Sequence, residues 1–371
     1  MNSIKVLEVI RQGQIGGGES HLIDLISGFG TDISPVVLAF TQGHMIDYLR
    51  EAGITCYVLE TRYAFDFRVF CKIREILKKE KIQIIHSHGS RAASNMAIIA
   101  GLMNIPMVYT VHGWSFHQDQ SAFIKTIRIL SEKFICFLSR EVICVSESNR
   151  KTGVKAFRLH NAIVIENGIN FQKFNPYNSF NNIREEFGLM LDDFVVGFIG
   201  RITLQKDPLT IVKAVESAHA ADPKIKAILV GDGDMKKSVL EYINDHHLKE
   251  VILTSGFRND IPDLLNAMDV FCQPSLWEGL SISLLEAMAM KKALLVTPTD
   301  GTREIIMDGI NGTIIGFGDT ALIAKKIIEY HLDRDKVKSH GENAYHLVKS
   351  RFDSKNVSEG VTGLYKGILK S

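Results

Sequence analysis

The sequence lacks the features of a secreted, metal-stabilised or nucleic-acid-binding protein. Its five cysteines stand without CxxC or similar spacing, which argues against a disulfide framework and a zinc site. Lys plus Arg (43) nearly balance Asp plus Glu (42), so the charge indicates no nucleic-acid partner. No apolar run approaches the ~20 residues of a spanning helix, and the start, MNSIKVLEVI, does not resemble a signal peptide. We expect a cytoplasmic protein, either free or associated with the inner face of the membrane.

What the sequence has instead is a repeated alternation of strands and helices. Apolar, β-branched runs such as IKVLEVI (4–10) and IQIIHSH (82–88) are separated by stretches of helical periodicity. This alternation is typical of a parallel sheet covered by helices on both faces. It restarts with DFVVGFIGR (193–201), after the turn-rich segment FNPYNSFNN (174–182). A length of 371 residues also suits two domains of ~100–200 residues each.

We therefore predict an α/β protein with two Rossmann-like, doubly wound domains that face each other across a cleft. The first domain spans residues 1–178 and the second residues 190–352. The helix-like segment 353–371 could pack back on the first domain. In doubly wound sheets ligands bind outside the carboxyl ends of the strands, so the residues that follow strands are the candidate site residues.

Three glycines, Gly16 to Gly18, stand between the first strand and the first helix in GQIGGGESHLIDL. Glycine lets the backbone approach a bulky anion, and a helix N-terminus offers N–H groups and the positive end of a dipole. One glycine would suffice for a tight turn, so three favour contact with a phosphate or a substrate. The spacing is not G-x-G-x-x-G, and no acidic residue ends the second strand to hold a ribose, which weakens a dinucleotide interpretation.

Two cations, Arg201 and Lys206, directly follow a strand of the second domain in GFIGRITLQKDP. Arginine offers a planar fork and lysine a mobile point charge, a combination that suits a diphosphate. The alternative is an ordinary solvated loop with two surface charges. Their location alone does not decide between the two interpretations.

The stretch WEGLSISLLEAMAM carries two glutamates, Glu278 and Glu286, at the start of a helix that Ser281 could cap. The N–H groups of Gly279, Leu280 and Ser281 would then be available for a phosphate. Carboxylates accept hydrogen bonds from hydroxyl groups, so a ligand with phosphates between a ribose and a sugar explains the pair. Taken singly, an exposed helix residue explains Glu286, and a favourable charge near the helix dipole explains Glu278.

The histidines and aspartates allow simpler interpretations. His112 ends a first-domain strand and could donate to a phosphate or sugar oxygen or act as an acid or base, although a lone histidine is more often structural. His86 and His88 share one side of a strand, but no third ligand is evident, so we expect no metal. Asp232 and Asp234 alternate with glycines, which favours a turn over a cation site.

Two basic segments, 72–83 and 121–140, leave the question of a membrane open. In the second, lysines and arginines are interleaved with phenylalanine, isoleucine and leucine. This segment could lie on an anionic membrane surface. It could equally pack in the core with its lysines and arginines solvated.

Together these motifs resemble the retaining glycosyltransferases of family 4, which have the GT-B fold. The resemblance covers most of the chain. Its last element, Glu278 with Glu286, looks like the E-x7-E signature of that family. The other matching motifs are the glycine loop with Glu19, His112-Gly113, VSES (145–148), ENGIN (166–170), GRITLQKD (200–207), GDG (231–233) and SGF (255–257).

The resemblance implies a nucleotide-sugar donor, bound mainly by the second domain without a metal or other cofactor. Glu286 would hold the ribose hydroxyls, and Phe257 and Arg258 would lie near the base. Glu278 and His112 would contact the transferred sugar as the catalytic residues. The diphosphate would be neutralised by Arg201 and Lys206 and by the backbone N–H groups of Gly17, Gly18, Gly279, Leu280 and Ser281.

We therefore predict a retaining, metal-independent glycosyltransferase that moves a sugar from a nucleotide-sugar to a glycan or lipid-linked oligosaccharide of a cell-surface polysaccharide. UDP is the expected nucleotide because most family members use it. Many relatives carry Gly and Pro where SIS (281–283) stands here, so the donor sugar stays open. No residue stands out as a nucleophile, which favours a front-face displacement. The alternatives are a UDP-sugar epimerase of the same architecture, a transferase acting on a small molecule, and a non-catalytic binding module.

Overall fold

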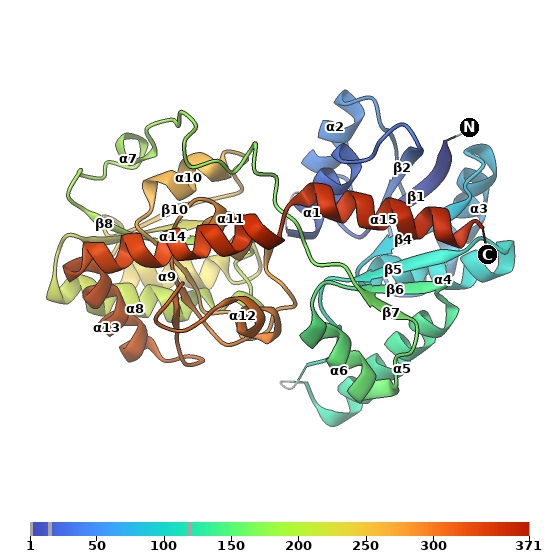
Figure 1. Ribbon diagram of the computed structural model, residues 1–371. Coiled ribbons are helices and arrows are strands. Elements are labelled where there is room, and N and C mark those ends of the chain that lie inside the picture. The colour runs from blue at the N-terminus through green and yellow to red at the C-terminus, as the bar shows by residue number, and fades with distance from the viewer. Residues whose placement is uncertain (1–2, 14–16, 118–119, 371) are drawn as a thin grey trace. The chain divides into compact units, whose positions relative to one another are not determined.

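The chain folds into two α/β units, each built on its own parallel sheet (Figure 1). The computed structural model describes residues 3–13, 17–117 and 120–370, so Gly16 of the glycine loop lies outside the described residues. Unit 1 comprises the chain up to Gly168 and the segment from Ser354 onward. Unit 2 runs from Ile169 to Asp353. The sequence-based boundaries lie at 178, 190 and 352.

Unit 1 contains a seven-stranded parallel sheet with the order β3-β2-β1-β4-β5-β6-β7. Its strands are β1 (Ile4–Ile10), β2 (Ile33–Ala39), β3 (Thr55–Val58), β4 (Ile84–His88), β5 (Met107–Val111), β6 (Glu141–Cys144) and β7 (Ala162–Val164). Its helices are α1 (Gly17–Ser27), α2 (His44–Glu51), α3 (Phe70–Lys79), α4 (Ser90–Met103), α5 (Ala122–Leu138), α6 (Glu147–Phe157) and α15 (Ser354–Ile368), with a 3₁₀ turn, η1 (Phe67–Val69).

Unit 2 contains a six-stranded parallel sheet with the order β10-β9-β8-β11-β12-β13. Its strands are β8 (Phe194–Ile199), β9 (Ile225–Val230), β10 (Ile252–Ser255), β11 (Val270–Gln273), β12 (Ala293–Val296) and β13 (Thr313–Ile314). Its helices are α7 (Ile183–Glu186), α8 (Pro208–Ala221), α9 (Lys236–Asp245), α10 (Ile261–Ala267), α11 (Ile282–Ala289), α12 (Asp300–Ile305), α13 (Thr320–Leu332) and α14 (Arg334–Arg351), with a 3₁₀ turn, η2 (Leu204–Lys206).

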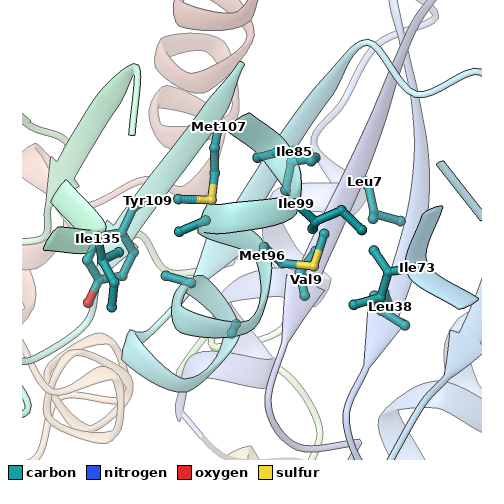
Figure 2. Close-up of a cluster of buried hydrophobic side chains, with 14 of the residues drawn as sticks. Leu7, Val9, Leu38, Ile73, Ile85, Met96, Ile99, Met107, Tyr109 and Ile135 are labelled. Carbon is teal, nitrogen blue, oxygen red and sulfur yellow. The ribbon is translucent and has the colours of Figure 1, made fainter. Parts of the chain in front are cut away.

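The main core of unit 1 lies between the sheet and helices α3, α4 and α5. Leu7 and Val9 of β1 point into it together with Met96 of α4 and Ile135 of α5, and all four side chains are buried (Figure 2). Burial of such a side chain contributes roughly 1.5–3 kcal/mol. This packing fixes the positions of the strands whose carboxyl ends carry the polar residues described below.

The opposite face of the same sheet is covered in part by the C-terminal helix α15. Val6 of β1 packs there with Tyr365 of α15, and the Ser358 hydroxyl donates a hydrogen bond to the carbonyl oxygen of Leu25 in α1 (3.2 Å). In Figure 1, α15 (red) lies alongside α1 (blue). Because strand side chains alternate between faces, Glu8 points to the same side as Val6. A carboxylate is thereby placed in an otherwise apolar layer.

Helix α5 packs Ile135 and Cys136 into the core but leaves most of its larger apolar side chains exposed, so the alternative of a core-packed helix holds for only a small part of residues 121–140. The exposed fractions of five apolar residues spaced four and three apart range from 44% to 82%. These are Phe123, Ile127, Leu130, Phe134 and Phe137. The buried positions of the helix are Glu132, Ile135 and Cys136. The helix therefore presents an apolar stripe outward, which we call the α5 stripe.

The other basic segment behaves differently. Helix α3 buries Ile73, Ile76 and Leu77 and leaves its lysines exposed, as an ordinary amphipathic surface helix does. Among the described residues, no helix combines the length and the apolar character needed to cross a bilayer.

Candidate functional site

In unit 2, the polar residues predicted from sequence gather where the strand order reverses. The central strand β8 has β9 on one side and β11 on the other, and β8 and β11 pair through Val196 with Val270. Ligands of doubly wound sheets bind at the carboxyl ends of the strands at such a reversal. The loop after β8 carries Arg201 and Lys206, and the loop after β11 carries Glu278.

Lys206 and Glu278 form a largely buried ion pair. The Nζ atom of Lys206 lies 2.6 Å from Oε1 of Glu278, and each side chain is only 11% exposed. Since removing one partner of a buried pair leaves an uncompensated charge, the two residues hold each other in position. Sequence reasoning assigned them to different parts of a ligand and did not foresee their contact.

Gln205, which sequence reasoning missed, ties the two loops together. The side-chain Nε2 of Gln205 donates to the backbone carbonyl oxygen of Trp277 (2.9 Å), and the backbone carbonyl oxygen of Gln205 accepts from the N–H of Leu276 (2.8 Å). Its Oε1 accepts a hydrogen bond from Nη2 of Arg201 (3.0 Å). Arg201 is thus oriented by a neutral amide, and within the described chain no carboxylate pairs with it. Its charge is left for a ligand.

The N-terminus of α11 differs from the prediction, because Ser281 does not cap the helix. Ser281 occupies the N-cap position, but its hydroxyl donates to Oε1 of Gln273 (2.8 Å) instead of accepting from the first turn. The Ser283 hydroxyl donates to the same oxygen (3.2 Å). Gln273, a second residue that sequence reasoning missed, is buried at the end of β11 and holds both serines of the SIS stretch. Gly279 and Leu280, which precede this N-terminus, are buried.

Glu286 is buried in α11, so the simple interpretation of an exposed helix residue is wrong. Its exposed fraction is 7%, and its neighbours Leu285 and Ala287 are fully buried. A carboxylate in such surroundings is destabilising unless polar groups satisfy it. Its position in the helix therefore has to be explained by what its oxygens bind.

Arg258 is already engaged by carboxylates of its own unit. Its guanidinium pairs with Asp260 and with Glu186 of α7, and these two carboxylates raise its pKa. The neighbouring Phe257 is 38% exposed. That Phe257 and Arg258 lie near the base of the nucleotide remains a prediction. Asp232 pairs with Lys236 (2.7 Å) and accepts from the N–H of Gly233, as in the turn favoured from sequence.

Unit 1 has a polar cluster at its own strand-order reversal, between β1 and β4, where Ile10 is in register with His88. Glu8 accepts hydrogen bonds from Tyr365 (Oε1, 2.8 Å) and from Nε2 of His88 (Oε2, 2.9 Å). His86 contacts the Tyr365 hydroxyl through Nδ1 (2.5 Å) and Thr110 through Nε2 (2.7 Å). Glu8, His86 and His88 are all buried, and the helix α15 completes their network.

His112 continues this network toward the surface. Its Nε2 lies 3.4 Å from Nδ1 of His88. Because Glu8 accepts from Nε2–H of His88, Nδ1 of a neutral His88 is an acceptor, and His112 donates to it through Nε2–H. This arrangement leaves Nδ1 of His112 as a hydrogen-bond acceptor. Gly18 lies beside this ring, since a Cβ on it would be 3.9 Å from Cδ2 of His112, while Gly17 is exposed at the start of α1.

The surroundings of this cluster favour an ionised Glu8 and neutral His88 and His112. Burial alone would raise the pKa of Glu8, but the charges and hydrogen bonds of His86 and His88 outweigh it and lower the pKa to about 2. Burial and the neighbouring His86 lower the pKa of His88 to about 4. Burial, followed by His88 and His86, lowers the pKa of His112 to about 3.

The expectation that His86 and His88 have no third neighbour of ligand type is wrong. Ligand-type atoms of Glu8, His86 and His88 lie within 4.8 Å of one another, as do those of His21, His88 and His112. Both ring nitrogens of His86 and of His88 already have hydrogen-bond partners. A metal would have to displace these hydrogen bonds, so the geometry favours a hydrogen-bond network in which each ring nitrogen has a fixed donor or acceptor role. A glutamate within a buried strand was the sequence signal for it.

Comparisons with known proteins agree on both halves of the chain. The model of the group 1 glycosyl transferases matches residues 179–347, and the model of glycosyltransferase family 4 matches residues 15–173. The Escherichia coli enzyme UDP-Gal:alpha-D-GlcNAc-diphosphoundecaprenol alpha-1,3-galactosyltransferase is 31% identical over 261 residues, which cover 68% of this chain and 67% of that protein.

A second relative and a solved structure extend the likeness. The Staphylococcus aureus capsular polysaccharide biosynthesis glycosyltransferase CapM is 27% identical over 321 residues, covering 82% of this chain and 83% of the relative. The structure of Anabaena HepE in complex with UDP and glucose superposes with a TM-score of 0.85 at 23% identity, covering 98% of this chain and 99% of HepE. The chain therefore belongs to the group 1 glycosyltransferases of family 4 and is a transferase with the two-domain, Rossmann-like GT-B fold.

Proposed function

We propose that this enzyme moves a sugar from a UDP-sugar to a glycan or lipid-linked oligosaccharide, with retention of the anomeric configuration and without a metal ion. The observation that carries the proposal is the ion pair of Lys206 and Glu278 beside Arg201, at the carboxyl ends of β8 and β11. The name of the E. coli relative specifies a UDP-galactose donor and a diphosphoundecaprenol acceptor. The HepE structure holds UDP.

The chemistry follows from the charges of these residues. Cleavage of the bond between the anomeric carbon and the diphosphate leaves negative charge on the phosphates. Arg201 and Lys206, held in place by Gln205 and Glu278, are preorganised to stabilise that charge. These two cations supply the positive charge that a divalent metal ion supplies in metal-dependent enzymes. The carboxylate beside them, Glu278, is held in the ion pair with Lys206, so we propose that the acceptor hydroxyl attacks on the face that the leaving group vacates and that its proton passes to the departing phosphate oxygen.

The remaining predicted residues complete the donor site. Glu286 accepts hydrogen bonds from the ribose, Phe257 and Arg258 lie near the base, and backbone N–H groups of Gly279, Leu280 and Ser281 assist at the diphosphate. In unit 1, the family resemblance assigns Gly17 and Gly18 to the diphosphate and His112 to the transferred sugar. The neutral His112 suits a sugar hydroxyl because its Nδ1 is an acceptor.

A panel of nucleotide-sugars tests the reaction class. We expect the purified enzyme to release UDP from one UDP-sugar, at an unchanged rate after treatment with EDTA. NMR of the glycoside product should show the anomeric configuration of the donor. Release of an epimerised donor in the absence of acceptor would identify an epimerase instead, and loss of turnover with the chelator would contradict the metal-independent mechanism.

The proposal includes attachment to an anionic membrane surface through the α5 stripe. Lys125, Arg128 and Lys133 are interleaved with the stripe, and Arg140 follows the helix. The one acidic residue of the helix, Glu132, is buried and accepts hydrogen bonds from Ser90 and Tyr109. An apolar stripe with basic flanks and no exposed acid is the pattern of a helix that lies in a membrane interface.

Removing one side chain of the stripe should weaken binding to vesicles. Phe137 is 82% exposed, and the Phe137→Ser variant is expected to bind phosphatidylglycerol vesicles about 10- to 100-fold more weakly, since a buried phenylalanine contributes roughly 1.5–3 kcal/mol. Co-sedimentation with vesicles measures the effect. Leu102→Ser, which removes an apolar residue that is 77% exposed on α4, is the matched control. Equal losses in both variants would contradict a specific role for α5.

A further inference from the structure

Three arginines of unit 1, which we call the arginine group, come together where the sheet reverses its strand order. Arg11 directly follows β1, and Arg91 is the second residue of α4, which follows β4. Because Ile10 of β1 is in register with His88 of β4, these two arginines leave the sheet from neighbouring strand ends. The third member, Arg128, lies on α5 beside Ile127 of the α5 stripe.

Hydrogen bonds link Arg128 to the same place. Its Nη1 donates to the carbonyl oxygen of Ser115 (3.1 Å), and the N–H of Ser115 donates to Oε1 of Glu132 (3.2 Å). The hydroxyl of Ser90, the residue before Arg91, donates to the same oxygen (2.6 Å). Through Ser115 and Ser90, the Glu132 carboxylate thus connects the loop that Arg128 binds with the start of α4, where Arg91 lies.

That carboxylate does not neutralise the group. Glu132 is fully buried, and its oxygens accept from Ser90, Ser115 and Tyr109. The other nearby acid, Asp66, is held by Arg68, which contacts both of its oxygens. In the described part of the chain no carboxylate forms an ion pair with Arg11, Arg91 or Arg128. The positive charges instead act on one another, since burial and the charges of Arg11 and Arg128 lower the pKa of Arg91.

The backbone adds to the positive potential. Helix α4 has 14 residues and begins after Gly89, whose φ of 81° suits glycine, and no side chain caps it. Arg91 lies in its first turn, where N–H groups have no intrahelical partner and the dipole favours an anion. Three unneutralised guanidinium groups and a helix N-terminus at one strand-order reversal form a site for a group with two or more negative charges.

We infer that Arg11, Arg91 and Arg128 bind the diphosphate of a lipid-linked acceptor, whose lipid chain follows the α5 stripe. The inference rests on the proposed function, because it assigns the acceptor rather than the donor. It explains why a basic group without acidic partners adjoins an apolar helix surface. Arginine suits the task because its planar fork binds phosphate oxygens in pairs.

Farnesyl diphosphate in neutral detergent is the probe, with UDP present at saturation so that the donor site is filled. Calorimetry should show binding to the parent enzyme and little binding of farnesol, which has the same chain without the charge. Arg91→Gln and Arg11→Gln should each weaken farnesyl diphosphate binding about 10-fold or more, as loss of a charged hydrogen-bonding partner does. Arg74→Gln, which removes a charge from the exposed side of α3, should leave it unchanged.

Two other outcomes would overturn the inference. Equal affinities of parent and Arg91→Gln for farnesyl diphosphate would exclude the arginine group as its site. Loss of binding to phosphatidylglycerol vesicles alone, with farnesyl diphosphate affinity retained, would assign the group to lipid headgroups. Binding of UDP and turnover of the UDP-sugar are measured on the same variants, so a failure of the donor reaction is separable from a failure at this site.

Discussion

Lys206→Ala is expected to reduce kcat about 100- to 1,000-fold while the protein stays folded. Removing a preorganised group that stabilises developing negative charge raises the barrier by roughly 2.7–4 kcal/mol. Lys206 is such a group because its Nζ is fixed 2.6 Å from Glu278 at the end of the central strands. Steady-state kinetics with a UDP-sugar measures the loss. Lys237→Ala, at a lysine that is 86% exposed on α9, is the control and should retain full activity.

The ion pair requires a second comparison, because Lys206→Ala also leaves Glu278 without its cation. Glu278→Gln and the double variant separate the two effects through UDP affinity. If Lys206 binds the diphosphate, Lys206→Ala and the double variant both bind UDP about 10- to 100-fold more weakly, and Glu278→Gln binds it like the parent. Recovery of UDP affinity in the double variant would show that the unpaired carboxylate, and not the missing charge, caused the loss.

The fold was predictable because its signals are local. A strand expected at residues 4–10 is β1, Ile4–Ile10, and the run at 193–201 contains β8, Phe194–Ile199. Alternation of β-branched runs with helical periodicity is a property of residues close in the sequence, so it can be recognised without any knowledge of the tertiary structure. The positions of Arg201, Lys206 and Glu278 after strands follow from the same pattern.

The pairings within the sites were not predictable, because they join distant parts of the chain. Nothing local connects Glu8 with Tyr365, which are separated by 357 residues, or Lys206 with Glu278. The family resemblance likewise placed Arg258 near a base, but it did not reveal that the carboxylates of Glu186 and Asp260 already pair with its guanidinium group. Serine at position 281 satisfies the local rule for an N-cap, but Gln273 of the preceding strand competes successfully for its hydroxyl.

Helix α5 shows the limit of periodicity. An apolar stripe spaced four and three apart predicts a buried helix face equally well whether the partner is a core or a membrane. Only the structure shows that Phe123 and Phe137 face outward while Glu132 faces inward. Glu132 was the available signal in the sequence. A helix that turns this carboxylate toward the protein turns its apolar stripe away from the core.

Glu286→Ala is expected to weaken UDP binding about 10- to 100-fold, because a carboxylate that accepts hydrogen bonds from hydroxyl groups contributes roughly 1.5–3 kcal/mol. Glu286 is only 7% exposed, so loss of its volume could also disturb α11. A ligand lacking the hydroxyl distinguishes the two causes. The parent should bind 2′- or 3′-deoxy-UDP more weakly than UDP, whereas the variant should bind the deoxy ligand and UDP alike.

The control for this experiment is Glu241→Ala, at a glutamate that is 59% exposed on α9 of the same unit. Calorimetric titration of both variants with both nucleotides gives the coupling between the side chain and the ribose hydroxyl directly. If Glu286→Ala discriminates UDP from its deoxy analogue as well as the parent does, the ribose contact is excluded. The buried carboxylate would then act on the helix N-terminus that precedes it, and the loss of affinity would fall on the diphosphate instead.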